Sequence, residues 1–478
     1  MTGAHASPLG TLAGIVGAAQ VLTEPSDLAA YQSDGRGAGG GAPIAVVRPN
    51  DADQVSALVR LAAEAGIRLV VAGGRTGLAG ASLAADGIPC GLVSLERLAG
   101  LIEIDPANRT ATVDAGVRLS ALNAAAAEHG LFFPIDLGAD PAIGGMIASN
   151  TGGARLLRYG DVRANLLSVE VVRSDAEGSR IPLGAPLRKN NTGLDLKQLL
   201  VGGCGSTGIV TRATVALHPL PAARLTALLA LDDPRAALPL LLALERDFGS
   251  WLSAFEGMSE AAIRSATDHV PGLRLPFGSP PPYAVLIELS AGAAFDENLL
   301  EERLAAALEP FMSGADASIR DAAIDRRDRL WALRHAIPEG LRANGTVVAC
   351  DIALRRGDVM AFRERMAGLL ARHAPGLVPH DFGHIGDGGL HYNLVWPRAN
   401  GTPDPALLES ARMLIFDTVV EEFGGSFSAE HGIGPRNIAS YRRFVPGAVR
   451  RLAGEIQDIM APVSSGRVDF GTTGEGTE

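Results

Sequence analysis

Three glycine-rich runs that also keep Ser, Thr or Asn constrain this chain more than any other feature. The first, GGRTG at 73–77, directly follows a β-rich run, and the others span 144–153 and 202–211. Successive backbone N–H groups in a tight glycine turn form an anion-binding nest suited to a pyrophosphate. The spacing matches neither the GxGxxG dinucleotide pattern nor a Walker loop ending in GK[ST]. Together the runs predict close backbone approach to a large, flat, polar ligand.

Composition narrows the class of protein. The chain has 478 residues, of which 47% are hydrophobic, so it can bury a large core in two or three domains. Its 42 Lys+Arg against 53 Asp+Glu give a net charge of −11. This acidic balance argues against nucleic acid and anionic membranes as partners, because both require a basic surface.

The cysteines and the N-terminus predict the compartment. Cys90, Cys204 and Cys350 are too few and too scattered for a disulfide framework. The first 20 residues lack the basic start and cleavage site of a secretion signal. No uncharged apolar stretch reaches the length of a transmembrane segment. We therefore expect a cytoplasmic protein without a transmembrane segment.

Hydrophobic periodicity predicts a first domain that ends near residue 219. Helical spacing covers 51–66 and about 119–128, and short β-rich runs stand at 69–74, 93–95 and 111–113. This alternation predicts an α/β or α+β domain with the first glycine run directly after a strand.

The second half has a different pattern. Helical spacing covers 235–247, 297–311 and 359–373, a strand is expected at AVLIEL, and Asp404-Pro405 is a typical helix start. These elements predict a second domain of antiparallel sheet plus helices. We expect domains at 1–219 and 220–424, followed by a C-terminal segment at 425–478.

Histidines gather in the second half. In HDFGHIGDGGLHYN, glycines 386, 388 and 389 exclude a helix, and the Asp-Gly step favours a hairpin that brings His384 and His391 together. Asn393 then shares the face of His391. Glu430 and His431 follow after the next helix. Two histidines and a carboxylate are typical of a catalytic zinc site, although spacing alone leaves a structural role equally open.

Longer segments extend these motifs. They are PNDADQVSALVRLAAEAG, VVAGGRTGLAG, PIDLGADPAIGGMIASNTGGARLLRYGDVRANLLSVEVV and LRKNNTGLDLKQLLVGG, followed by GHIGDGGLH and SAEHGIG. In this order the chain resembles the FAD-linked D-2-hydroxyacid dehydrogenases of the vanillyl-alcohol oxidase superfamily over residues 10–470. The D-2-hydroxyglutarate dehydrogenase branch is the most similar, followed by D-lactate dehydrogenases and the glycolate oxidase FAD subunit.

The resemblance implies an α+β fold with a two-subdomain FAD-binding domain of vanillyl-alcohol oxidase type and a cap of antiparallel sheet plus helices. It also implies that the C-terminal segment, 425–478, returns to the flavin site. It also implies FAD, held non-covalently because the glycine loop carries neither His nor Cys. The implied FAD-binding residues are Gly73, Gly74, Arg75, Thr76, Gly77, Ser82, Pro134, Leu137, Gly138, Gly144, Gly145, Ser149, Asn150, Gly152, Gly153 and Ile209.

The same resemblance implies the reaction and its residues. His384, His391 and Glu430 would bind a divalent metal, expected to be zinc, and His431 would be the base. Arg334 would bind the substrate carboxylate, with Asn393 as a further substrate contact. The expected reaction oxidises a D-2-hydroxyacid to the 2-oxoacid by proton loss from the hydroxyl and hydride transfer to flavin N5.

Four positions depart from the family pattern. Cys204 replaces a usual glutamate in the third glycine run, and we expect it to be an inert small residue. Pro338 and Ala349 replace a substrate-binding threonine and lysine, and Arg355 stands where relatives have proline. The substrate therefore stays open between D-2-hydroxyglutarate and a D-lactate-like acid.

Other functions remain as alternatives. An oxygen-reducing flavoprotein oxidase is the nearest. A zinc hydrolase built on the two histidines and Glu430 would leave the glycine runs unexplained, and a non-catalytic flavin protein would leave His431 unexplained. For the dehydrogenase, the expected electron acceptor is an electron-transfer flavoprotein or a quinone, and family analogy allows a homodimer.

Overall fold

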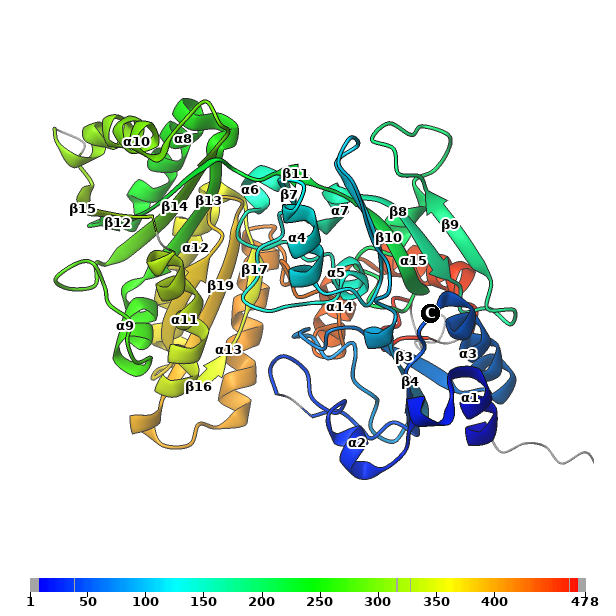
Figure 1. Ribbon diagram of the computed structural model, residues 1–478. Helices are drawn as coiled ribbons and strands as arrows, with labels where there is room; N and C mark the ends of the chain where they lie inside the picture. Colours follow the sequence, from blue (N-terminus) through cyan, green and yellow to red (C-terminus); the bar gives the residue numbers. More distant parts are fainter. Residues whose placement is uncertain (1–7, 38, 315–316, 327, 464, 472–478) are drawn as a thin grey trace, which may run out of the picture. The chain divides into compact units, whose positions relative to one another are not determined.

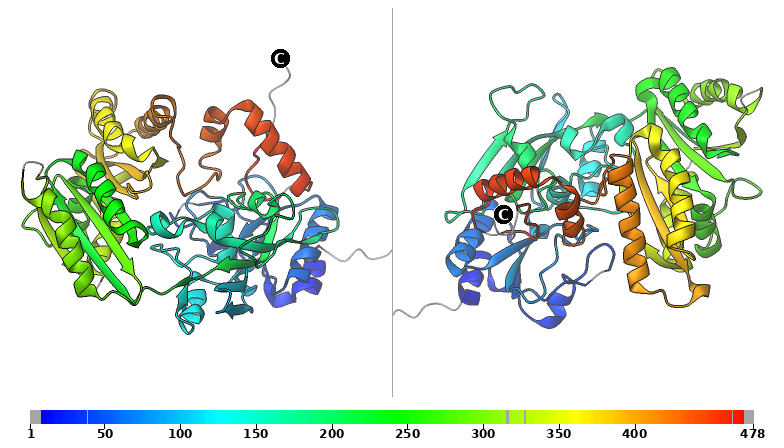
Figure 2. Two further views of the ribbon diagram at one scale, coloured as in Figure 1. Left: turned by 90° about the horizontal axis from the view of Figure 1, so that it is seen from above. Right: turned by 180° about the vertical axis from the view of Figure 1, so that it is seen from behind.

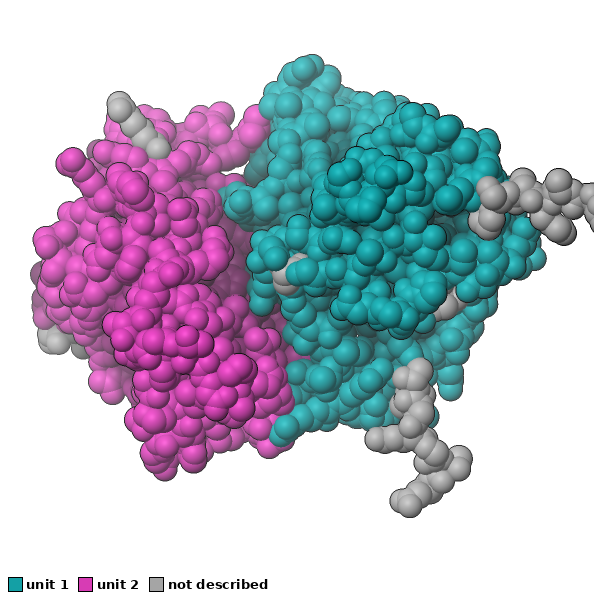
Figure 3. Space-filling view, turned by 90° about the horizontal axis from the view of Figure 1, so that it is seen from below, with its two compact units in different colours: residues 1–151, 161–219, 430–478 teal, residues 152–160, 220–429 magenta. Residues whose placement is uncertain are grey.

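The computed structural model describes residues 8–37, 39–314, 317–326, 328–463 and 465–471. The chain forms two compact units, coloured separately in Figure 3. Unit 1 contains 1–151, 161–219 and 430–478, and unit 2 contains 152–160 and 220–429. Unit 1 is therefore built from three separate stretches of chain.

Unit 1 contains two larger sheets and one short one (Figure 1). The four-stranded sheet has the order β1-β2-β4-β3, with β2, β4 and β3 parallel. Its strands are β1 (Val21–Leu22), β2 (Ala45–Val47), β3 (Arg68–Ala72) and β4 (Cys90–Ser94). The five-stranded sheet is antiparallel, with the order β5-β6-β10-β8-β9. Its strands are β5 (Ile102–Asp105), β6 (Thr110–Asp114), β8 (Leu166–Val172), β9 (Arg180–Gly184) and β10 (Ile209–Ala216); β7 (Leu131–Phe132) pairs with β11 (His218–Pro219).

The helix α3 (Ala52–Ala65) of unit 1 begins and ends at its capping residues. The Asp51 side chain accepts from the Gln54 N–H, and Gly66 closes the helix with φ 62°. The helix α5 (Ile143–Ser149) carries the second glycine run. The remaining helices are α1 (Pro8–Val16), α2 (Pro25–Ala29), α4 (Leu119–Ala127), α7 (Val162–Asn165), α14 (Ile438–Phe444) and α15 (Gly447–Met460).

Unit 2 is built on one antiparallel sheet with the order β15-β12-β14-β13-β18-β19-β16, and β17 also pairs with β19 (Figure 1). The strands β12, β13 and β14 are mostly apolar and almost wholly buried, as expected for the centre of a sheet covered on both faces. The strands are β12 (Ala223–Leu231), β13 (Leu252–Ser259), β14 (Tyr283–Ala291), β15 (Ile319–Asp325), β16 (Gly345–Val348), β17 (Asp351–Ala353), β18 (Val378–Gly383) and β19 (Gly389–Pro397).

Helices cover both faces of this sheet (Figure 2). The helices α9 (Glu260–His269) and α11 (Arg329–Asn344) share one core with Leu286 and Phe382 of the sheet. The opposite face carries α8 (Ala237–Phe248), α10 (Glu297–Met312) and α12 (Val359–His373). Two further helices are α6 (Leu156–Tyr159) and α13 (Pro405–Asp417). A charged residue on the α11 face must therefore find its partners inside this core.

The structure confirms the predicted mixture of helices and sheets. The helices expected at 51–66, 119–128, 235–247, 297–311 and 359–373 are α3, α4, α8, α10 and α12. The predicted antiparallel sheet with helices in the second half is also present. Within the described ranges, the helices are all too short or too polar to cross a membrane.

Candidate active site

A tight turn after β18 places His384 beside His391. The carbonyl of His384 accepts hydrogen bonds from the N–H groups of residues 387–389, each at 3.1 Å. Gly388 has φ 94°, and a Cβ there would lie 2.1 Å from the Leu354 carbonyl oxygen, so this turn requires glycine. The two imidazole centroids are 5.4 Å apart.

His384 does not share the strand face of His380 and Phe382. The strand β18 ends at Gly383, whose φ of 139° breaks the alternation of side chains. His380 and Phe382 do alternate in register, opposite Asn393 and His391 of β19. The turn, rather than the strand, therefore brings His384 to His391.

Each of these two imidazoles has a carboxylate at Nδ1. His384 Nδ1 lies 2.5 Å from Glu256 Oε1, and His391 Nδ1 lies 3.5 Å from Asp351 Oδ1. A carboxylate at Nδ1 favours the tautomer that keeps the proton there and leaves the lone pair on Nε2. Two imidazoles that are unprotonated at Nε2 fit a divalent metal such as zinc.

Arg334 reaches the same carboxylate from α11. Its Nε donates to Glu256 Oε2 at 2.7 Å, and its guanidinium carbon lies 4.6 Å from the centre of the Phe382 ring. Burial opposes ionisation of Glu256, but the charges and hydrogen bonds of His384 and Arg334 outweigh it and lower the pKa of this carboxyl to about 2. Glu256 is therefore a carboxylate at neutral pH, although it is fully buried.

The other substrate-related positions of unit 2 lie on nearby elements. Pro338 lies within α11, one helical turn after Arg334. Ala349 lies between β16 and β17, which both pair with the strand that carries Asn393. Arg355 is exposed.

His373 and His380 have no role in the expected chemistry. His373 is exposed at the end of α12. His380 is buried, and its Nδ1 lies 2.9 Å from the Val378 carbonyl oxygen. Burial lowers the pKa of His380, so its imidazole is neutral at pH 7.

In unit 1 the first glycine run packs against the second. A Cβ on Gly73 would lie 3.6 Å from the Gly145 nitrogen, and one on Gly74 would lie 2.6 Å from Arg118 Nη1. Among the described residues, the N–H groups of residues 74–77 have no backbone acceptor. A loop that is pressed close to its neighbours and presents unbonded N–H groups fits a pyrophosphate.

The third glycine run joins the other two. Its Gly202 and Cys204 N–H groups donate to the carbonyls of Ile147 and Ala148, at 3.1 and 2.8 Å, where α5 ends. A Cβ on Gly205 would lie 3.7 Å from the Val71 side chain, just before the first run. Most of the second run, up to Thr151, therefore lies with the other two runs in unit 1.

The remaining predicted cofactor residues have varied surroundings. The Ser149 hydroxyl donates to the Gly145 carbonyl, and the Asn150 amide donates to Asp161 and accepts from the Arg163 N–H. Ile209 begins β10 and is buried. The loop residues are Ser82, before β4, and Pro134, Leu137 and Gly138, after β7; Gly152 and Gly153 belong to unit 2.

Glu430 and His431 open the last stretch of unit 1. The next residue, Gly432, has φ 74°, and a Cβ there would lie 3.7 Å from the Cys204 sulfur. Burial raises the pKa of the Cys204 thiol to about 11, and the Ile433 N–H offsets only part of this rise. Cys204 is therefore a neutral thiol that packs against the segment following His431.

Sequence reasoning missed Glu256 and gave Asp351 no role. Glu256 lies 128 residues from His384 and 78 from Arg334, so no local motif connects them. One signal was present: Glu256 is the only charged residue in the strand LSAFEGMS. A charged residue in a buried strand requires a partner, and that requirement could have marked it.

Two family models together match most of the chain. One, described as an FAD binding domain, matches residues 43–181, and the other, described as the C-terminal domain of FAD linked oxidases, matches residues 220–455.

Curated relatives match over nearly the whole chain. D-2-hydroxyglutarate dehydrogenase of Xanthomonas citri pv. viticola is 35% identical over 426 residues, which cover 88% of this chain and 87% of that protein. The enzyme of the same name from Stutzerimonas stutzeri is 33% identical, over 89% of this chain and 90% of that protein. The mitochondrial enzyme of Bos taurus is 30% identical, over 93% and 79% respectively.

Solved structures confirm the predicted vanillyl-alcohol oxidase-type fold. p-Cresol methylhydroxylase matches with a TM-score of 0.72 at 14% identity, covering 95% of this chain and 94% of that one. The 4-ethylphenol oxidase from Gulosibacter chungangensis matches with a TM-score of 0.70 at 18% identity, with the same coverage.

Proposed function

Because the chain belongs to the FAD-linked D-2-hydroxyacid dehydrogenases, we propose that it oxidises a D-2-hydroxyacid to the 2-oxoacid with metal assistance. The observation that carries the proposal is the cluster on one sheet face of unit 2. It combines His384, hydrogen-bonded at Nδ1, and His391, whose Nδ1 lies 3.5 Å from a carboxylate, with a buried guanidinium hydrogen-bonded at Nε. The imidazoles suit a metal, and the guanidinium suits a substrate carboxylate.

The glycine runs of unit 1 would hold FAD, and His384, His391 and Glu430 would hold the metal. When bound, FAD supplies a hydride acceptor at N5 and a divalent metal such as zinc supplies a Lewis acid that lowers the pKa of the substrate hydroxyl. The electrons would then pass to an electron-transfer flavoprotein or a quinone.

Chain connectivity supports Glu430 as the third ligand. The N–H of Ala429 donates to the Asp351 carbonyl at 3.2 Å, and Asp351 pairs with His391 in the β17–β19 ladder. Glu430 follows Ala429 by one peptide bond, so the backbone enters Glu430 from a fixed point beside His391.

The side chains of the protein would bind and orient the substrate and accept its proton. Arg334 binds the substrate carboxylate through its Nη groups, and Asn393 orients the substrate through its amide. His431 accepts the proton of the C2 hydroxyl at a ring nitrogen, because the ordinary pKa of an imidazole lies near neutral pH. The carboxylates at the two Nδ1 atoms keep the metal-binding imidazoles in one orientation.

Two acids are candidate substrates. The names of the relatives favour D-2-hydroxyglutarate, whereas Pro338 and Ala349 favour a smaller or more apolar D-acid. Neither of these side chains can pair with a distal carboxylate, and Arg355 is the nearest arginine in sequence to Ala349.

The deciding experiment is anaerobic bleaching of the purified protein's flavin spectrum by D- and L-2-hydroxyacids. We expect bleaching by D-acids and not by their L-enantiomers. Bleaching by D-2-hydroxyglutarate identifies a dicarboxylate site, whereas bleaching only by D-lactate or apolar D-acids identifies a smaller one. A colourless protein, or flavin that no D-acid reduces, would refute the proposal.

The metal and the electron acceptor need separate measurements. Exhaustive chelation should abolish dye reduction, and zinc should restore it; full turnover after chelation would rule out the metal role. Slow reoxidation of the reduced protein in air supports a dehydrogenase. Fast reoxidation would make the protein an oxidase.

A further inference from the structure

One buried carboxylate contacts both the proposed metal-binding side and the proposed carboxylate-binding side of the site. Glu256 Oε1 lies 2.5 Å from His384 Nδ1, and its Oε2 lies 2.7 Å from Arg334 Nε. We propose that Glu256 is a positioning residue that fixes the His384 tautomer and the plane of the Arg334 guanidinium together. This inference rests on the proposed function and deepens it.

On the histidine side, Glu256 determines which ring nitrogen can bind metal. A carboxylate only accepts hydrogen bonds, so Nδ1 of His384 must carry the proton. Nε2 then keeps its lone pair for a metal ion. His384 is 8% exposed, so bulk water has little access with which to replace this partner.

On the arginine side, Glu256 limits rotation of the guanidinium. Its hydrogen bond fixes Nε, and the Phe382 ring lies 4.6 Å from the guanidinium carbon. Together these two contacts limit rotation of the group, because the hydrogen bond fixes one nitrogen and the guanidinium carbon lies over the Phe382 ring. The Nη groups then form a preset fork for a carboxylate, which lowers the entropy lost on binding substrate.

Tight packing around Gly257, the residue after Glu256 on β13, further restricts the position of Glu256. A Cβ on Gly257 would lie 2.2 Å from the Tyr283 hydroxyl oxygen and 2.9 Å from the Ile385 side chain. The strand β13 is therefore packed tightly against Tyr283 and against the residue that follows His384. The Glu256 backbone cannot shift without moving these neighbours.

The test is Glu256→Gln in the FAD holoenzyme. A glutamine has one accepting oxygen and one donating NH2, so it can satisfy His384 or Arg334 but opposes the other. Loss of such an outer partner typically weakens metal binding about 10- to 100-fold. We expect that loss in zinc affinity, measured by competition with a chelating dye, together with a higher KM for the D-acid that bleaches the flavin fastest.

Glu288→Gln is the matched control. Glu288 lies on the neighbouring strand, is equally buried, and is also bound by an arginine. Within the described part of the chain, Glu288 forms no hydrogen bond or ion pair with His384 or Arg334. This variant should therefore lose stability but keep the wild-type zinc affinity and KM.

The outcomes separate this inference from the function on which it rests. A Glu256→Gln protein that melts earlier but keeps wild-type zinc affinity and KM would make Glu256 only a structural ion-pair partner. If that variant fails to fold, Glu256→Asp keeps the acceptor on a shorter side chain; weaker zinc binding supports the inference and unchanged binding overturns it. A wild-type protein that neither binds zinc nor is bleached by D-acids would refute the function itself.

Discussion

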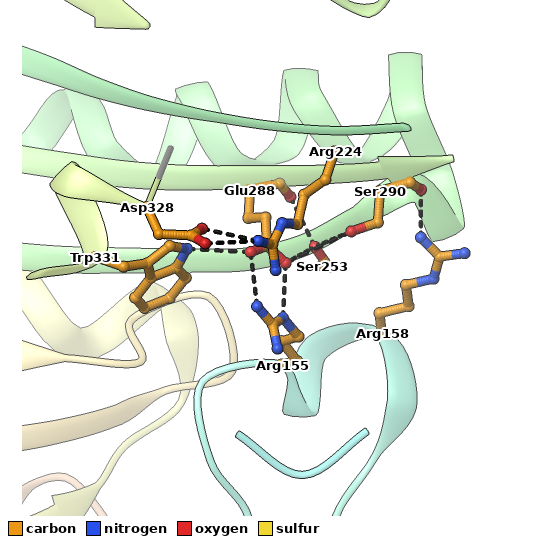
Figure 4. Close-up of polar contacts among 8 residues, drawn as sticks. All are labelled: Arg155, Arg158, Arg224, Ser253, Glu288, Ser290, Asp328 and Trp331. Atoms are coloured by element: carbon orange, nitrogen blue, oxygen red, sulfur yellow. Dashed lines mark hydrogen bonds and ion pairs between the residues drawn. The ribbon is translucent and has the colours of Figure 1, made fainter. Parts of the chain in front are cut away.

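Glu256 on β13 and Glu288 on β14 lie on neighbouring strands, are both fully buried, and both accept from side chains of α11. Figure 4 shows the partners of Glu288. Arg155 gives it two nitrogens, at 2.8 and 3.0 Å, and Ser253 and the Trp331 indole complete its shell. Arg334, by contrast, gives Glu256 only Nε, and the other donor is an imidazole.

This difference indicates that Glu288 anchors other elements to the sheet, whereas Glu256 positions side chains of the proposed site. The donors to Glu288 connect other elements to the sheet by hydrogen bonds. Arg155 connects the segment 152–160, and Trp331 connects α11. Arg158 adds a contact to the Ser290 carbonyl from the same segment (Figure 4). The donors to Glu256 are the residues proposed to bind the metal, through His384 Nε2, and the substrate carboxylate, through the Arg334 Nη groups. The role of a buried carboxylate therefore cannot be inferred from burial alone. It depends on which atoms its partners keep for other contacts, as His384 keeps Nε2 and Arg334 keeps its Nη groups.

The largest effect should come from Arg155→Met. This change leaves Glu288 buried without its cation, and breaking a buried pair in this way costs about 3–5 kcal/mol. Thermal unfolding should show a clearly lower midpoint, with zinc affinity retained. The control is Arg224→Ala, which removes a partly exposed pair with Asp328 (Figure 4) and should cost only about 0–1 kcal/mol. Equal losses in the two variants would contradict the anchoring role.

A smaller effect is expected from Asp351→Asn. Its carboxylate lies 3.5 Å from His391 Nδ1, a longer contact than that of Glu256 with His384. We therefore expect zinc affinity to fall by about tenfold, the lower end for an outer partner. The same chelator competition measures it. KM should rise less than in Glu256→Gln, because among the described residues Arg334 forms its hydrogen bond and ion pair with Glu256 and not with Asp351. A larger rise would show that the two carboxylates share their roles.

The smallest effect concerns pH. Burial opposes ionisation of Glu288, but its hydrogen bond and ion pair with Arg155 prevail and lower its pKa. A carboxyl with a lowered folded pKa stabilises the protein above its unfolded pKa of about 4.3 and loses that contribution as pH falls through the folded value. The difference in thermal midpoint between wild type and Arg155→Met should therefore narrow below that pH. A constant difference would mean that the charge of Glu288 is not what Arg155 stabilises.

Local signals in the sequence predicted local structure well. Asp404 accepts from the Ala406 N–H at the start of α13, as the Asp-Pro pair predicts. The Asp-Gly step predicted the β18–β19 hairpin, and the turn requires the glycine at 388 for steric reasons. Such features depend on residues a few positions apart, so periodicity and turn chemistry can find them.

Long-range partners could not be predicted in the same way. No spacing rule connects Glu256 with His384, and the pairing of Arg155 with Glu288 spans 133 residues. The sequence also did not indicate that 152–160 belongs to unit 2, because the second glycine-rich run, 144–153, continues across that boundary without a change in composition. These contacts follow from the order of strands in the sheet, which hydrophobic patterns do not specify.

The three-part construction of unit 1 affects how the protein can be made. The N–H of Gly466 donates to the Leu69 carbonyl at 2.8 Å, and that of Val468 donates to the Ser206 hydroxyl at 3.1 Å. Residues 220–429 are synthesised before Gly466 and Val468. Unit 2 can therefore begin to fold before unit 1, which is complete only when its last stretch has been synthesised. Flavin would then bind only late in synthesis, after the last stretch of unit 1 has joined the rest of that unit.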